Sequence, residues 1–185
     1  TNGDVVQLQA ITAASIEQVA SSTATSITTF SGAVNTNGLI GATTNGVSLT
    51  GRSFTINGIT TTGSGGVAID ASTGGAILLQ TTALALDGAF AKTGLGTTTL
   101  GVNIFTTDDN ISFSGGNTTL SVNARTLAAG TGTITFNNGL ALQTNTLTLS
   151  ADGIDFLGGA NSVTGSSSAS ALCLFGATGT STIGI

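Results

Sequence analysis

One six-residue pattern decides the fold, and it occurs three times: ISFSGG at residues 111–116, ITFNNG at 134–139 and IDFLGG at 154–159. In each copy an isoleucine and a phenylalanine alternate with polar residues, which is the period of a β-strand with one buried face. Each strand ends in glycine or asparagine, which favour turns. The copies follow one another at similar intervals along the chain. The pattern therefore predicts a repeating unit of one short strand and one turn.

Phenylalanine followed closely by a turn also occurs outside this region. A repeat of about 19–24 residues with several short strands is satisfied by a parallel β-helix, in which each repeat forms one coil and coils stack about 4.8 Å apart. A single coil cannot bury its apolar face, so neighbouring coils create the core. Equivalent side chains then lie above one another. The phenylalanines expected to form this core stack are Phe30, Phe54, Phe113, Phe136, Phe156 and Phe175.

Strand signals recur along the whole chain, and proline, which would block a ladder hydrogen bond, is absent. The expected strands are residues 5–11, 27–30, 47–49, 54–56, 67–69, 77–79, 84–86, 97–105, 111–113, 119–122, 133–136, 140–142, 146–149, 154–157, 171–174 and 182–185. The chain is therefore expected to be all-β, a single solenoid domain over residues 1–185 with roughly eight coils. Residues 1–26 are less regular. There Ser15–Gln18 fits a capping box, which leaves a short helix or an irregular coil as alternatives.

A β-sandwich is the rival fold, because it also has short strands at regular spacing. Hairpins favour Asn-Gly and Asp-Gly, which occur at 45–46, 57–58, 87–88 and 138–139. The recurrence of the phenylalanine pattern, the scarcity of aromatic residues and the surface of Thr, Gly and Ala favour the solenoid.

The composition excludes several function classes. The chain has 185 residues, of which 6% are charged, and it has no histidine and one cysteine. A Ser-His-Asp or Cys-His nucleophile and a zinc site of several His and Cys are therefore excluded. Three basic residues and a net charge of −5 argue against nucleic-acid binding. No apolar run has the length of a membrane-spanning helix. We expect no cofactor, no nucleic-acid partner and no membrane span.

The carboxylates offer weak candidates for catalysis. In a strand, Asp108 and Asp109 would point to opposite faces, which makes a poor acid–base pair. Asp152 and Asp155 could approach only in a turn. Residues 108–110 could hold an adventitious cation, but no calcium-binding loop is present. We therefore expect no catalytic, cofactor or metal site.

Cys173 is interpreted as a small buried hydrophobe, with an intermolecular disulfide as the alternative.

Threonine pairs suggest a different function. Thr-x-Thr occurs at 60/62, 97/99, 133/135, 144/146/148 and 180/182. A flat array of such pairs on one face could order water and bind ice. The spacings are irregular, and threonine also serves β-propensity on outward strand faces.

The two ends resemble strands without caps. The C-terminal segment 182–185 and the N-terminal segment 5–8 would expose unpaired backbone groups and core. The chain also lacks an initiator methionine and a signal peptide, which suggests a processed form or a piece of a longer chain. We expect the coils to continue in a longer chain or to stack head to tail into a homo-oligomer or filament.

Segments 111–116, 130–139 and 147–154 resemble the repeats of filamentous-haemagglutinin-like large exoproteins of bacteria. The likeness covers about residues 27–185, and the family's secretion domain with its Asn-Pro-Asn motifs is absent. The resemblance implies a right-handed parallel β-helix, export to the cell surface or medium, and a role as adhesin, stalk or matrix fibre. We therefore expect a non-enzymatic extracellular structural protein, with surface glycans as candidate partners. The alternatives are a polysaccharide-binding or -cleaving β-helix and an ice-binding solenoid.

Overall fold

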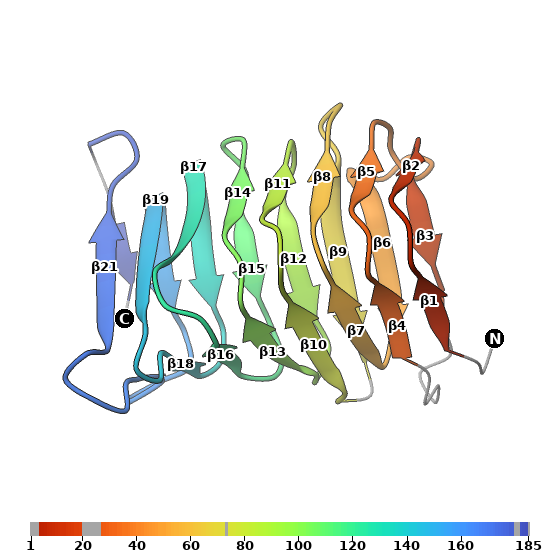
Figure 1. Ribbon diagram of the computed structural model, residues 1–185. Coiled ribbons are helices and arrows are strands. Elements are labelled where there is room, and N and C mark those ends of the chain that lie inside the picture. The colour runs from red at the N-terminus through yellow and green to blue at the C-terminus, as the bar shows by residue number, and fades with distance from the viewer. Residues whose placement is uncertain (1–3, 20–26, 73, 180–181, 185) are drawn as a thin grey trace.

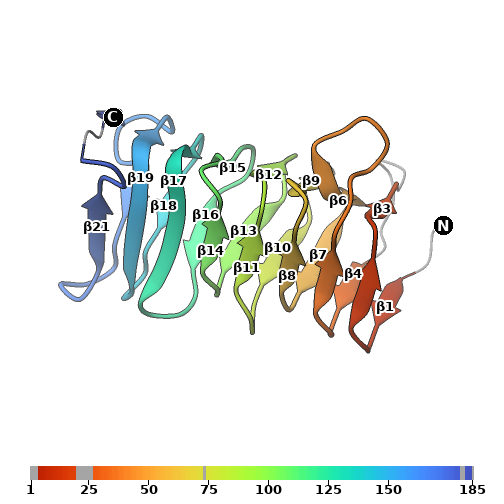
Figure 2. The ribbon, with the colours of Figure 1, turned by 90° about the horizontal axis from the view of Figure 1, so that it is seen from above.

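The computed structural model describes residues 4–19, 27–72, 74–179 and 182–184. The chain winds into a parallel β-solenoid of about seven turns, in which the described part contains strands and turns but no helix (Figures 1 and 2). The all-β parallel β-helix is thus confirmed, with about seven turns instead of the expected eight coils. No helix in the described part of the chain is long and apolar enough to cross a membrane.

The coil has three sides, which we call faces 1, 2 and 3. Face 1 is one eight-stranded sheet, and faces 2 and 3 form one fourteen-stranded sheet because two long strands, β17 and β19, turn the corner between them. Face 1 consists of β1 (Val5–Gln7), β4 (Ile27–Phe30), β7 (Ser53–Ile56), β10 (Ala76–Leu79), β13 (Thr97–Leu100), β16 (Thr118–Leu120), β18 (Leu140–Ala141) and β20 (Val163–Thr164).

The other two faces are built in the same way. Face 2 consists of β2 (Ile11–Ala13), β5 (Val34–Thr36), β8 (Ile59–Thr61), β11 (Leu84–Leu86), β14 (Ile104–Thr106), the first halves of β17 (Arg125–Phe136) and β19 (Thr146–Phe156), and β21 (Ala171–Phe175). Face 3 consists of β3 (Ile16–Gln18), β6 (Asn45–Gly51), β9 (Gly66–Ala71), β12 (Phe90–Thr93), β15 (Ile111–Phe113), the second halves of β17 and β19, and β22 (Thr182–Gly184).

All strand pairs among the described residues are parallel, which rules out the β-sandwich with its antiparallel hairpins. Asn45-Gly46 does not make a hairpin turn but lies within β6. Asn57-Gly58 connects β7 to β8 around a corner of the coil.

The repeated pattern of the sequence forms the centre of the core on face 3. Phe113 pairs in register with Phe136, and Phe136 with Phe156. The ring centroids of the first pair are 5.0 Å apart with planes 2° from parallel, and those of the second are 5.8 Å apart at 6°. Phe90, which the sequence reading left out of the stack, packs against Phe113 with the planes tilted by 48°.

The expectation of one stack of six phenylalanines is wrong for three of them. Phe30 and Phe54 are buried, but they lie on face 1, away from the face 3 stack. Phe30 pairs with Ile56, and Phe54 pairs with Thr28. The rings of Phe30 and Phe54 therefore do not lie above each other either. Phe175 lies at the end of β21 on face 2 and is 58% exposed. The loops differ in length from one coil to the next. The number of residues between two phenylalanines therefore does not determine on which face each of them lies.

The N-terminal segment forms a coil without a helix. Residues 16–18 are the strand β3, in which Ile16 pairs with Val47 and Gln18 with Leu49. This corrects the helix alternative for Ser15–Gln18, and residues 20–26 lie outside the described part. The expected strand 97–105 is two strands, β13 and β14, which lie on different faces. The expected set of strands did not include β3, β5, β8, β12 or β20.

Asparagine and aspartate side chains tie successive coils together at the corners. Each accepts a hydrogen bond from a backbone N–H one coil further on, where the strand ladders are interrupted. These bonds join Asn103 Oδ1 to Thr126 N (2.9 Å), Asp108 Oδ1 to Thr131 N (2.9 Å), Asn110 Oδ1 to Thr133 N (2.8 Å), Asn117 Oδ1 to Gly139 N (3.1 Å) and Asn123 Oδ1 to Thr146 N (2.8 Å).

Candidate functional site

Two of the carboxylates that the sequence analysis considered for catalysis, those of Asp108 and Asp152, have structural roles. Asp108 and Asp109 lie in the turn between β14 and β15, and not in a strand as the argument from opposite faces assumed. Asp108 has a left-handed backbone (φ 61°), and its Oδ1 accepts the hydrogen bond from Thr131 N. Asp152 accepts bonds from both the backbone N–H (2.9 Å) and the hydroxyl of Thr178. These carboxylates hold the next coil in place.

Asp155 lies apart from Asp152, on the outward side of β19, where it pairs with Thr135 and Gly184. The described residues contain no group of three or more His, Cys, Asp or Glu that could hold a metal ion. Asp87 and Asp109 do share a polar hollow of about 400 Å³ at the corner between faces 2 and 3, together with Ser64 and Thr107.

Charge is distributed unevenly around the rod. The acidic residues that point outward from face 3 are Glu17, Asp70 and Asp155. Those at the corner between faces 2 and 3 are Asp87, Asp108, Asp109 and Asp152. The outward-facing residues of the described strands on faces 1 and 2 include no charged side chain. Acidic side chains are therefore concentrated on face 3 and at its corner with face 2, while the charged residues next to faces 1 and 2 are Asp4 before β1, Arg52 before β7 and Arg125 at the start of β17.

One outward residue from each strand of face 2 belongs to a column along the rod, which we call the face 2 column. Successive members are register partners on adjacent strands. They are Thr12, Asn35, Thr60, Ala85, Phe105, Ala128, Ser150 and Phe175. Two exposed aromatic rings thus stand in a column of otherwise small or polar side chains.

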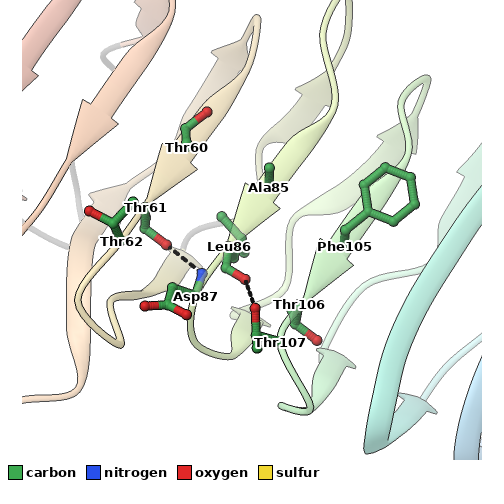
Figure 3. A pocket seen from close by; sticks show the side chains of 9 residues that line it. All are labelled: Thr60, Thr61, Thr62, Ala85, Leu86, Asp87, Phe105, Thr106 and Thr107. Atoms are coloured by element: carbon green, nitrogen blue, oxygen red, sulfur yellow. Dashed lines mark hydrogen bonds between the residues drawn. The ribbon is translucent and has the colours of Figure 1, made fainter.

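A shallow groove of about 380 Å³ surrounds the first of these rings (Figure 3). The groove crosses β8, β11 and β14. Its lining includes the outward-pointing side chains of Thr60, Ala85 and Phe105. Its other lining residues are Thr61, Thr62, Leu86, Asp87, Thr106 and Thr107. The Phe105 side chain is 39% exposed.

Hydrogen bonds fix the floor and one end of the groove. The backbone N–H of Asp87 donates to Thr61 Oγ1 (3.0 Å), and Thr107 Oγ1 donates to the carbonyl of Leu86 (3.5 Å) (Figure 3). Oδ2 of Asp87 accepts a bond from Ser64 N at 2.7 Å. The groove is therefore preformed. The sequence did not predict this groove. It predicted one strand over 97–105, whereas the structure has two strands on different faces, and Phe105 lies on the second.

Lys92 is a second group that sequence reasoning missed. It occupies an inward position of face 3, paired with Ile69 on one side and Phe113 on the other, and is fully buried. Its Nζ donates to the carbonyls of Gly94 (3.0 Å) and Ser114 (3.1 Å). Burial lowers the pKa of its ammonium group below the usual 10.5, and the charge of Asp70 partly opposes this. The amine is thus held inside the core by backbone acceptors.

The C-terminal end of the solenoid is open and apolar. A hollow of about 600 Å³ lies there, lined by Phe156, Gly159, Ala160, Asn161, Ser162, Val163, Leu172, Leu174 and Ile183. The inward side chains of β20, β21 and β22 form its apolar part. Among the described residues, these three strands have no partner on their outer edge.

The N-terminal end is partly closed by a polar side chain. Gln18 lies at an inward position of β3, where its Oε1 accepts a bond from the hydroxyl of Thr28 (3.0 Å) and its amide donates to the carbonyl of Thr50 (3.5 Å). Val6 of β1 and Leu8, which follows this strand, are exposed. The strands β1, β2 and β3 also lack a partner on their outer edge within the described part of the chain.

Cys173 is a free thiol on the outward side of β21, paired with Thr148, and it is half-buried. It is therefore not the fully buried residue that the sequence suggested.

The Thr-x-Thr pairs are divided among the faces. Thr97 and Thr99 point outward from face 1, Thr60 lies on face 2, and Thr133 and Thr135 lie on face 3. Thr180 lies outside the described residues. The pairs of the described part do not form one array on a common face.

Comparison of the chain with known protein families, with curated proteins and with solved structures found no match.

Proposed function

We propose that the chain is a non-enzymatic structural β-solenoid, part of an extracellular bacterial fibre or adhesin, whose coils pair end to end. One observation carries the proposal: both ends of the described solenoid present three parallel strand edges around inward apolar side chains. Unpaired strand edges beside an open core are a template for pairing with another coil.

The chemistry of the ends favours another parallel coil as the partner. At the C-terminal end, Val163, Leu174 and Ile183 occupy the next positions of the buried columns of the core. At the other end, Ile11 and Ile16 do the same. A coil placed on either end would continue the ladders and bury these side chains. That coil belongs either to a longer chain or to a second copy, and in both cases a longer rod results.

The other features of the chain fit a passive extracellular role. The carboxylates of Asp108 and Asp152 are engaged in hydrogen bonds between coils. With three basic residues the chain offers few sites to trypsin-like proteases, and its weak charge permits close association. The resemblance to filamentous-haemagglutinin-like exoproteins supports export and a fibre or adhesin role.

Negative-stain electron microscopy of the natively isolated material tests the proposal. We expect rods or filaments longer than the roughly 35 Å that seven turns span at the strand spacing. Discrete particles of that short length would overturn it.

A pair of variants tests whether pairing at the ends is responsible. Ile183→Lys places a charge in the open C-terminal end and should abolish stacking between copies. Leu95→Lys, at an exposed position between β12 and β13, should leave it unchanged. Filaments that persist in Ile183→Lys would contradict stacking through this end.

A further inference from the structure

We propose that face 2 binds a linear, neutral polysaccharide along the rod axis, with Phe105 as the stacking residue of the groove and Phe175 as a second contact. This binding does not depend on pairing at the ends, because the groove lies on the side of the rod.

Phe105 lies outside the buried core of the rod, and its ring is 39% exposed. It points outward from β14, away from the core, in a column whose other members before Phe175 are small or polar. Its neighbours in the face 2 column are Ala85 and Ala128, which leave room beside the ring. An exposed ring beside a preformed hollow is typical of a ligand site, in which an apolar surface is combined with a few placed polar groups.

A sugar ring matches this surface. The face of an aromatic ring carries negative charge density, which attracts the polarised C–H groups on the flat side of a pyranose. The polar groups needed for the sugar hydroxyls lie around the ring. The Thr60 hydroxyl is directed outward, and the Asp87 carboxylate lines the groove (Figure 3). Only Oδ2 of that carboxylate has a partner within the described residues, so Oδ1 can accept from a ligand hydroxyl.

The charge pattern selects a neutral ligand. The outward residues of face 2 have no charge, and the nearest corner carries Asp87, Asp108 and Asp109. These carboxylates would repel sulfated or uronic-acid polymers and nucleic acids. The single lysine, Lys92, is buried on face 3, and Arg125 at the start of β17 is half-buried at an inward position, where it pairs with Leu147.

The two rings select a linear polymer. Phe105 and Phe175 are members of the same column, three strands apart. At about 4.8 Å per strand they lie about 14 Å from each other along the axis. The strands that carry them, β14 and β21, are on the same side of the rod (Figure 1). An extended glycan of a few sugar units spans that distance, and a single small sugar does not.

Affinity electrophoresis tests the proposal with soluble neutral glycans (mixed-linkage β-glucan, xyloglucan and galactomannan), and a pull-down does so with insoluble cellulose. Alginate, an anionic linear glycan, is the contrast. We expect retention by at least one neutral glycan, unaffected by high salt. Retention by none of them, or by alginate alone, would overturn the proposal.

Variants at the ring sharpen the test. Phe105→Ala and Phe105→Leu should each weaken binding about two- to tenfold, since both remove the aromatic face, whereas Phe105→Trp should retain it. Phe175→Ala should weaken binding to long glycans more than to short oligosaccharides. Leu95→Ala, which removes an exposed apolar side chain outside face 2, should change nothing. Wild-type affinity in Phe105→Ala, or an equal loss in Leu95→Ala, would contradict a ring-specific site.

Structural controls separate this inference from the proposed fibre. Phe105→Ala should still unfold cooperatively and at a midpoint only slightly below that of the wild type, because the ring is partly exposed and lies outside the core. Rods seen by electron microscopy without glycan binding would overturn the inference alone. Glycan binding by short particles would overturn end-to-end pairing alone.

Discussion

The middle of the rod and its C-terminal end use the same residue types on the same backbone, yet they differ in burial. Phe113 and Phe136 in the middle are almost fully buried, whereas Ile183, at an inward position of the last coil, is 50% exposed. Ile183 pairs with Ile154 and continues the same inward column. Only the neighbouring coil is missing. Burial in this fold is therefore a property of two adjacent coils, and stability arises mainly from nearest-neighbour contacts.

The largest expected effect comes from cutting the middle stack. Phe136 is stacked between Phe113 and Phe156. Phe136→Ala should lower the free energy of unfolding by about 3–5 kcal/mol, through lost burial and a cavity that two fixed coils cannot close. Urea denaturation followed by circular dichroism measures the loss.

Phe175→Ala is the matched control for this variant. The ring is 58% exposed, so its removal should cost less than about 1 kcal/mol. Equal losses at the two positions would mean that the stacked, inward position of Phe136 adds nothing to its contribution, and would remove the contrast between the buried ring of the middle and the exposed ring of the last coil.

Two glycines sharpen the same contrast on the backbone. Gly115 (φ 87°) and Gly159 (φ 83°) both have left-handed conformations after a core phenylalanine. A Cβ on Gly115 would clash with the carbonyl oxygen of Gly94 in the preceding coil, whereas a Cβ on Gly159 would meet nothing within 4 Å. Gly159→Ala should cost only the strain of the left-handed conformation, about 1–2 kcal/mol.

Gly115→Ala should cost about 2–4 kcal/mol, because the coils must also separate at this corner. Thermal and urea unfolding of both variants measure the difference. If the two substitutions cost the same, then strain of the backbone alone, and not close contact between coils, explains the glycines of the repeated pattern.

The sequence was most informative where the repeat is most regular. The alternation and turn residues of 111–116 predicted the strand β15 with its correct ends, and the parallel ladders followed from the repeat. The register explains why other predictions failed. Val47 pairs with Ile16 in the coil before it and with Val67 in the coil after it, and the first of these intervals in the sequence is much longer than the second. Loops absorb this difference, so no constant period places Phe30 or Phe175 correctly.

The candidate site could not be predicted for the same reason. A single strand over 97–105 would have placed Phe105 on the same side as Thr97 and Thr99. In the structure the chain turns a corner at residues 101–103, which moves Phe105 from face 1 to face 2. The alternation of side chains in a strand predicts which residues point inward and which point outward. It does not predict on which of the three faces a strand lies. The role of the corner aspartates could not be predicted either. The backbone N–H groups that bond to them lie one coil further along the chain, and the sequence does not show which residues those are.

Lys92 tests whether the middle of the core tolerates a charge. Its pKa is lowered in the folded state by burial, so between that value and 10.5 the unfolded state binds more protons. The free energy of unfolding should therefore rise as the pH increases toward 10.5. Lys92→Met should remove this rise. Urea unfolding at several alkaline pH values measures it.

The chain is suited to this measurement, because it has one lysine and no tyrosine. A stability that is flat with pH in the wild type would show that Nζ reaches water despite its buried position. A rise that persists in Lys92→Met would assign the pH dependence to another group.

The smallest expected effect compares two threonines at inward positions of face 1. The hydroxyl of Thr98, in a middle coil, is buried and has no hydrogen-bond partner, whereas the hydroxyl of Thr28, near the N-terminal end, donates to Gln18. Thr98→Val exchanges an unpaired hydroxyl for a methyl group of similar size and should stabilise the protein by about 1 kcal/mol. Thr28→Val should destabilise it by about the same amount, because it leaves the Gln18 carbonyl without its donor. Opposite signs in urea unfolding would show that the middle of the rod requires an apolar interior while the end depends on polar closure; equal signs would mean that the two coils do not differ in this respect.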